Sequence, residues 1–151
     1  MTTILIVLAI VLVAVIAIGV GMWRRKRQRE LSEHSITPDE LHRLMDSAPK
    51  VLVYDVRQPL DLLADSEIIP GAQRIAPQEI LDDPSVLPRE REFVVYCTCP
   101  GDKTSRSILD RALSEGFTKV RFLKGGIAGW KASGFSVIPY DKPFHLNTIR
   151  G

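Results

Sequence analysis

Cysteine and histidine are scarce in this chain of 151 residues, which has two cysteines and three histidines. Cys97 and Cys99 stand two residues apart, a spacing that rarely reaches disulfide geometry, so no disulfide framework is expected. Unpaired thiols indicate a reducing compartment. His34, His42 and His145 lie far from the cysteines in sequence, which disfavours a metal site on the cysteine pair.

An excess of positive charge is missing from most of the chain, although the formal net charge is +2. Residues 1–30 carry five Lys or Arg and one acidic residue, whereas residues 31–151 carry 15 and 17. No basic stripe with interleaved aromatic residues follows, so nucleic-acid binding is not expected. The chain also lacks internal repeats and low-complexity tracts, and its length suits one domain of ordinary size.

A long uncharged run is present at the N-terminus. Residues 4–23 are dominated by Ile, Val, Leu and Ala, which is long enough for a transmembrane helix. Residues 24–35 begin with a basic run and are predicted to be a juxtamembrane tether, which either stops transfer or contacts anionic membrane lipid. The positive-inside bias places the following domain on the cytoplasmic side of a single-pass protein. A cleaved signal peptide fits less well, because its charges precede a shorter apolar core.

Strands and helices are predicted to alternate after the tether. Three apolar runs indicate buried strands, at residues 51–54, 93–96 and 120–123. Thr37 and Glu40 form the pattern of a capping box at the start of a helix. Residues 58–67 are expected to be a long loop with a helical turn, Gly125 and Gly126 to form a turn, and Trp130 to be a core residue. Alternation of this kind predicts an α/β fold, with a mostly parallel sheet flanked by helices. The domain is expected at residues 36–139, followed by a tail at residues 140–151.

The stretch at residues 93–105 carries the strongest chemical signal. Its strand ends at Cys97, Pro100 and Gly101 form a loop, and Thr104 or Ser105 is predicted to cap the next helix. Backbone N–H groups and a helix N-terminus favour negative charge there, which is expected to lower the thiol pKa and make Cys97 a nucleophile. The alternative is a buried structural thiol.

Four segments in series resemble the successive motifs of the rhodanese-like domain. They are residues 55–57, residues 69–72, residues 94–97, and residues 125–127 with Trp130. The resemblance implies a sulfurtransferase without a metal or organic cofactor. In that family, the cysteine matching Cys97 attacks thiosulfate or a persulfide, becomes a persulfide, and passes the outer sulfur to a thiol or protein acceptor.

The loop also suggests roles for residues around Cys97, because a persulfide anion needs hydrogen-bond donors. Substrate-binding residues are expected in the loop, at Thr98, Cys99, Gly101, Lys103, Thr104 and Ser105, and at Arg57 after the neighbouring strand. Asp55 and Arg57 are expected to form a structural ion pair or to organise a loop beside the site, and direct substrate binding is the alternative role for Arg57. The Cys-x-Cys-Pro start resembles a membrane-associated branch of the family, and the loop is longer than usual by one or two residues. Cys99 is either a sulfur acceptor, a resolving thiol or only a loop residue.

Two other functions are known for domains with such a fold. A rhodanese-like fold can be a non-catalytic binding or sensing module, since fold does not determine function. Phosphatases and arsenate reductases with this fold need Cys-x5-Arg, so that a guanidinium binds the oxyanion with two hydrogen bonds. Here Lys103 follows Cys97 by six residues and Ser105 follows Cys99 by six, which argues against that chemistry.

Overall fold

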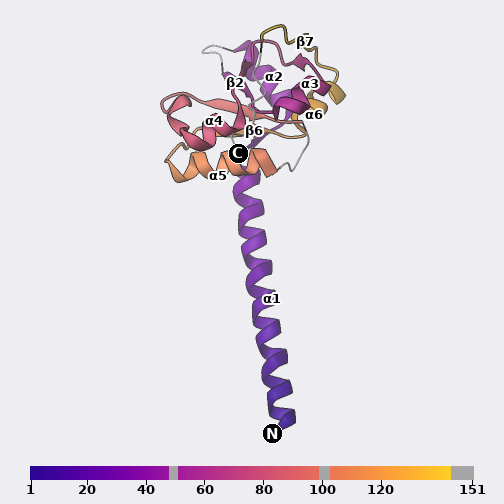
Figure 1. Cartoon of the computed structure of the whole chain (residues 1–151), viewed down its shortest axis with the longest axis vertical. Coiled ribbons are helices and arrows are strands. Elements are labelled where there is room, and N and C mark those ends of the chain that lie inside the picture. The colour runs from indigo at the N-terminus through magenta and orange to yellow at the C-terminus, as the bar shows by residue number, and fades with distance from the viewer. Residues whose placement is uncertain (48–50, 99–102, 144–151) are drawn as a thin grey trace, which may run out of the picture. The chain divides into compact units, whose positions relative to one another are not determined.

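The computed structural model describes residues 1–47, 51–98 and 103–143 (Figure 1). It contains two compact units, Met1–His34 and Ser35–Gly151. The first unit is a single helix, α1 (Thr2–Glu33). By length and composition alone, its segment Ile6–Glu30 could cross a membrane. The predicted tether is therefore helical through Glu33.

The second unit is built on a five-stranded sheet in which every neighbouring pair is parallel, in the order β1-β6-β5-β2-β4. From one edge to the other, the strands are β1 (Ser35–Ile36), β6 (Val120–Leu123), β5 (Phe93–Tyr96), β2 (Leu52–Asp55) and β4 (Gln73–Arg74). Two further strands, β3 (Glu67–Ile68) and β7 (Ile138–Pro139), form an antiparallel pair. The α/β fold with a mostly parallel sheet is confirmed.

Helices cover both faces of this sheet (Figure 1). They are α2 (Pro38–Asp46), α3 (Pro59–Ala64), α4 (Pro77–Asp82), α5 (Lys103–Ser114) and α6 (Gly126–Ala132), with a 3-10 turn η1 (Pro84–Val86). Helices α4 and α5 lie side by side, and α5 also contacts β6. All four residues of β5 are buried, because this central strand has helices on both sides.

One apolar core unites α2, α6 and the sheet. Val94 and Tyr96 of β5 belong to the same buried cluster as Leu41 of α2 and Trp130 of α6. Trp130 is 2 % exposed, and its indole N–H donates to the carbonyl of Ser136 at 2.9 Å. The prediction that Trp130 is a core residue is confirmed.

Of the helix caps predicted from the sequence, one is present in the structure and one is not. The capping box of α2 is confirmed: the Thr37 Oγ1 accepts from the Glu40 N–H, and the Thr37 N–H donates to the Glu40 carboxylate. The predicted cap of α5 is wrong. This helix begins at Lys103, so Thr104 and Ser105 lie inside its first turn. Residues 58–67, expected to be a long loop with a helical turn, contain the six-residue helix α3, which has proline at its first position.

Candidate active site

Cys97 directly follows the central strand of the sheet and is 4 % exposed. The register aligns Asp55 of β2 with Tyr96 of β5 and with Arg74 of β4. The carboxyl ends of three neighbouring strands therefore meet beside Cys97. In open parallel sheets this edge is where ligands bind, which makes it the candidate site.

The N-terminus of α6 holds the Cys97 backbone. The Ile127 N–H donates to the Cys97 carbonyl at 3.0 Å. Gly126 has φ of +55°, and a Cβ at this position would lie 2.3 Å from the Cys97 oxygen and 3.2 Å from the Thr98 carbonyl carbon. No side chain fits that contact, so glycine allows α6 to approach the cysteine. Sequence reasoning explained the glycine pair only as a turn, and nothing in its spacing signals a contact with Cys97.

Thr98 places an unusual polar atom next to the cysteine. Its Oγ1 is buried and has no hydrogen-bond partner among the residues that the structure describes. Most buried hydroxyl groups in folded proteins are hydrogen-bonded, because an unsatisfied one costs about 1–3 kcal/mol. The residue that follows Cys97 thus has an unused hydrogen-bonding capacity.

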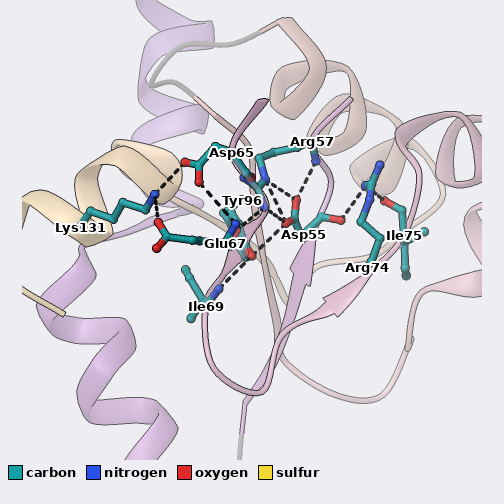
Figure 2. Close-up of polar contacts among 9 residues, drawn as sticks. All are labelled: Asp55, Arg57, Asp65, Glu67, Ile69, Arg74, Ile75, Tyr96 and Lys131. Atoms are coloured by element: carbon teal, nitrogen blue, oxygen red, sulfur yellow. Dashed lines mark hydrogen bonds and ion pairs between the residues drawn. The ribbon is translucent and has the colours of Figure 1, made fainter. Parts of the chain in front are cut away.

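At the carboxyl end of β2, Asp55 and Arg57 form a fully buried ion pair (Figure 2). The Arg57 Nη2 donates to an Asp55 carboxylate oxygen at 2.6 Å, and Nε donates to both carboxylate oxygens at 3.0 Å. The Tyr96 hydroxyl donates to the same carboxylate at 3.1 Å and accepts from the Ile69 N–H at 3.2 Å. These bonds connect the ends of β2 and β5 to the segment that follows α3.

Arg57 also reaches this segment directly. Its Nη1 donates to the Asp65 carbonyl at 2.8 Å and its Nη2 to the Glu67 carbonyl at 2.6 Å. Lys131 of α6 binds the side chains of the same two residues, with its Nζ 2.7 Å from Asp65 and 2.5 Å from Glu67 (Figure 2). The segment is thus bound to Arg57 by its backbone and to Lys131 by its carboxylates.

Burial and pairing shift several pKa values in this network. Burial opposes the charge of Arg57, but the hydrogen bonds and charge of Asp55 outweigh it and raise the pKa. Burial, and then the Asp55 charge, raise the pKa of Tyr96, so its hydroxyl stays a neutral donor. The hydrogen bond from Lys131 lowers the pKa of Asp65, and the bonds to Asp65 and Glu67 raise the pKa of Lys131. Lys131 and Asp65 are therefore both ionised at neutral pH.

The predicted substrate-binding residues fall into three groups. Cys99 and Gly101 lie outside the described residues, as does the side chain of Lys103. Thr98 follows Cys97 directly, whereas Thr104 and Ser105 lie in the first turn of α5, where Ser105 is 7 % exposed. Arg57 has 1 % of its surface exposed and donates to protein acceptors from three of its side-chain atoms, which favours the structural role.

Comparisons with known proteins find a matching family and similar sequences. The model of a family described as the rhodanese-like domain matches residues 37–133. The chain is 34 % identical over 99 residues to the probable adenylyltransferase/sulfurtransferase MoeZ of Mycobacterium tuberculosis, covering 64 % of this chain and 24 % of that protein. It is 25 % identical over 105 residues to a sulfurtransferase of Allochromatium vinosum, covering 70 % of this chain and 94 % of that protein. The chain thus spans about a quarter of the length of the MoeZ protein.

Solved structures show the same fold. A full-length protein from Lactobacillus plantarum superposes with a TM-score of 0.66 at 22 % identity, covering 79 % of this chain and 98 % of the other. A rhodanese-related protein from Thermoplasma volcanium superposes with a TM-score of 0.56 at 24 % identity, covering 70 % and 97 %. At such identities the likeness concerns the fold alone.

Proposed function

Since the chain belongs to the rhodanese-like domain family, we propose that it is a sulfurtransferase that carries sulfane sulfur on Cys97. The donor is thiosulfate or a persulfide, and the acceptor is a thiol. The observation that carries this proposal is the position of Cys97 at the carboxyl end of the central strand, with its carbonyl bound to the N–H of Ile127. The names of two relatives, a probable adenylyltransferase/sulfurtransferase and a sulfurtransferase, support the same reaction class.

The proposed reaction has two displacement steps at sulfur. The Cys97 thiolate attacks the sulfane sulfur of thiosulfate, forming a new S–S bond while the thiosulfate S–S bond breaks and sulfite leaves with the electron pair. The acceptor thiolate then attacks the outer sulfur, and the Cys97 thiolate leaves. The sulfur atom is transferred without an external oxidant or reductant.

The persulfide formed between these steps is an anion that needs hydrogen-bond donors. We expect these to come from the N–H groups of residues 98–105 and from the hydroxyl of Thr98, whose partner is missing in the described residues. The side chain of Arg57 is committed to Asp55 and is not assigned to the substrate. Its proposed role is to hold the ends of β2 and β5 in register.

We further propose that α1 anchors this domain to a membrane as a single span. Its length and apolar composition support this, and the basic run after residue 23 favours the cytoplasmic side for the domain. The acceptor would then be met at or near the membrane surface.

The decisive experiment is mass spectrometry of the full chain in detergent after incubation with thiosulfate. We expect a mass gain of one sulfur atom, which peptide fragmentation places on Cys97 and which a thiol reductant removes. Cys97→Ser should abolish the gain, while the matched variant Cys99→Ser should keep it. Absence of the gain in the native chain, or its persistence in Cys97→Ser, would contradict the proposal and favour a non-catalytic binding module.

A further inference from the structure

We propose that Lys131 is a positioning residue for Cys97, because its ion pairs complete a closed series of contacts that begins and ends at the Cys97 backbone. Lys131 lies in α6, outside the four motifs that resemble the family, and sequence reasoning assigned it no role. The inference rests on the proposed function in one respect: one of the two rates measured below is a rate of sulfur transfer. The positioning itself is a property of the fold.

The first half of the series runs along α6. The Cys97 carbonyl accepts from the Ile127 N–H at 3.0 Å, and Gly126 packs against the same carbonyl with no room for a Cβ. Trp130 secures the middle of the helix, because it is buried in the core. Lys131 follows directly, so a movement of its end of this seven-residue helix is transmitted to the Cys97 backbone.

The second half returns from Lys131 to the cysteine through the network in Figure 2. Lys131 binds the carboxylates of Asp65 and Glu67, whose backbone carbonyls accept from Arg57. Arg57 in turn binds Asp55 through two carboxylate oxygens. The Asp55 carboxylate accepts from the hydroxyl of Tyr96, the residue bonded to Cys97. Every link is a contact of 3.1 Å or less.

The ion pairs of Lys131 join two parts of the chain that are far apart in sequence. Lys131 binds a segment 66 residues away in sequence, and its side chain is 33 % exposed, so it can be changed without opening the core. Loss of its charge would let α6 and the segment at residues 65–67 shift relative to each other. A misplacement of about 1 Å at a reacting group can cost about a hundredfold in rate, so a smaller shift should cost several-fold.

The test compares three variants of the full chain in detergent. Lys131→Met removes the charge and keeps most of the side-chain stem, and Lys131→Arg restores a charged donor. Arg121→Met is the matched control, because the Arg121–Glu92 pair has a similar length of 2.6 Å and a similar exposure of 42 % and 36 %. Arg121 lies in β6 beside Val94, and Glu92 precedes β5, so this pair is away from the carboxyl ends of the strands.

Two rates are measured for each variant. One is persulfide formation on Cys97 as a function of thiosulfate concentration, and the other is alkylation of Cys97 by iodoacetamide across pH in a Cys99→Ser background. We expect Lys131→Met to lower the maximal rate of persulfide formation about three- to tenfold, with a change in KM of less than about twofold, and to shift the alkylation profile. Lys131→Arg should recover most of the rate, and Arg121→Met should match the native chain.

The outcomes separate the two proposals. If Lys131→Met and Arg121→Met lower the rates equally, or if Lys131→Met matches the native chain, the positioning role is overturned. If the native chain forms no persulfide but Lys131→Met still shifts the alkylation profile, the proposed function fails and the positioning role stands. Circular dichroism and thermal unfolding of each variant show that the compared chains are folded.

Discussion

At the scale of single residues, the site rests on polar groups that are buried and almost fully satisfied. Asp55 and Arg57 have side chains with no exposed surface, which is costly for two charges unless each finds partners. Arg57 donates to Asp55, Asp65 and Glu67, and the Asp55 carboxylate also accepts from Tyr96. The ion pair therefore fixes the ends of β2 and β5 relative to each other. Removal of either side chain would leave the other charge buried and unpaired.

Thr98 is the exception at this scale, and it leads to a prediction. Its buried Oγ1 has no partner among the described residues, which costs the resting protein stability. Thr98→Val, which keeps the shape, should raise the free energy of unfolding by up to about 1–2 kcal/mol. It should also slow persulfide formation about tenfold, because the persulfide loses a hydrogen-bond donor. Urea unfolding and the thiosulfate assay measure the two effects.

Thr98→Ser is the control for this prediction, since it keeps the hydroxyl and removes only a methyl group. It should transfer sulfur at close to the native rate. If Thr98→Val were as active as the native chain, the hydroxyl would have no part in the chemistry. A loss of stability in that variant would show that the hydroxyl has a partner in the folded protein.

At the scale of elements, the site depends on how closely α6 approaches the end of β5. Helix α6 has only seven residues and a short helix contributes little stability of its own, so its position is set by packing. Gly126 allows the close approach because it has no Cβ, and the buried side chain of Trp130 packs the middle of the helix into the core. Near the C-terminal end of the helix, Lys131 forms an ion pair with the segment after α3. The central strand is placed by its two neighbours, and α6 then holds the residue that follows it.

Gly126→Ala tests this arrangement against Gly134→Ala. Both glycines have positive φ, +55° and +82°, so either alanine introduces backbone strain of about 1–2 kcal/mol. A Cβ at Gly134 meets no atom within 4 Å, whereas one at Gly126 would lie 2.3 Å from the Cys97 oxygen. We expect Gly126→Ala to lose at least about 2 kcal/mol more stability than Gly134→Ala, measured by urea unfolding.

The rate of persulfide formation should also distinguish these two variants. Gly134→Ala should form the Cys97 persulfide at close to the native rate, while Gly126→Ala, where it folds, should lose most of that rate because the cysteine backbone is displaced. Equal losses of stability in the two variants would mean that the contact between Gly126 and the Cys97 oxygen does not constrain the fold.

At the scale of the whole molecule, an apolar helix and an α/β domain share one short chain. Segment Ile6–Glu30 of α1 has the length and composition of a membrane span, and the domain begins at Ser35. A sulfurtransferase joined to such a helix would be confined to donors and acceptors that reach the membrane surface. The proposed function therefore includes a restriction on location that the sheet and its site do not impose.

The proposed membrane anchor leads to a prediction that membrane fractionation can check. The full chain should stay with membranes after an alkaline carbonate wash, with its intact mass showing that residues 1–30 are retained. A variant lacking residues 2–23 should be released, because the uncharged run is gone. Release of the full chain by carbonate, or an N-terminus that begins after the apolar run, would instead indicate peripheral attachment or a cleaved signal.

The sequence alone determined what depends on neighbours along the chain. Apolar runs predicted β5 and β6 with their observed bounds, and the Thr37–Glu40 pattern predicted the capping box of α2. The two-residue strands β1 and β3 were missed, because a strand so short carries no periodicity. Helix α3 was predicted only as a helical turn within a loop, because six residues with scattered leucines resemble a loop.

Only the tertiary structure decided which distant residues support Cys97. The sequence predicted a cysteine at a strand end and its chemistry, because strand, loop and helix follow one another locally. It did not reveal the contact of Gly126 with the Cys97 carbonyl or the ion pairs of Lys131 with Asp65 and Glu67. These contacts join segments about 30 to 66 residues apart, and such pairings exist only after the sheet has brought its strand ends together.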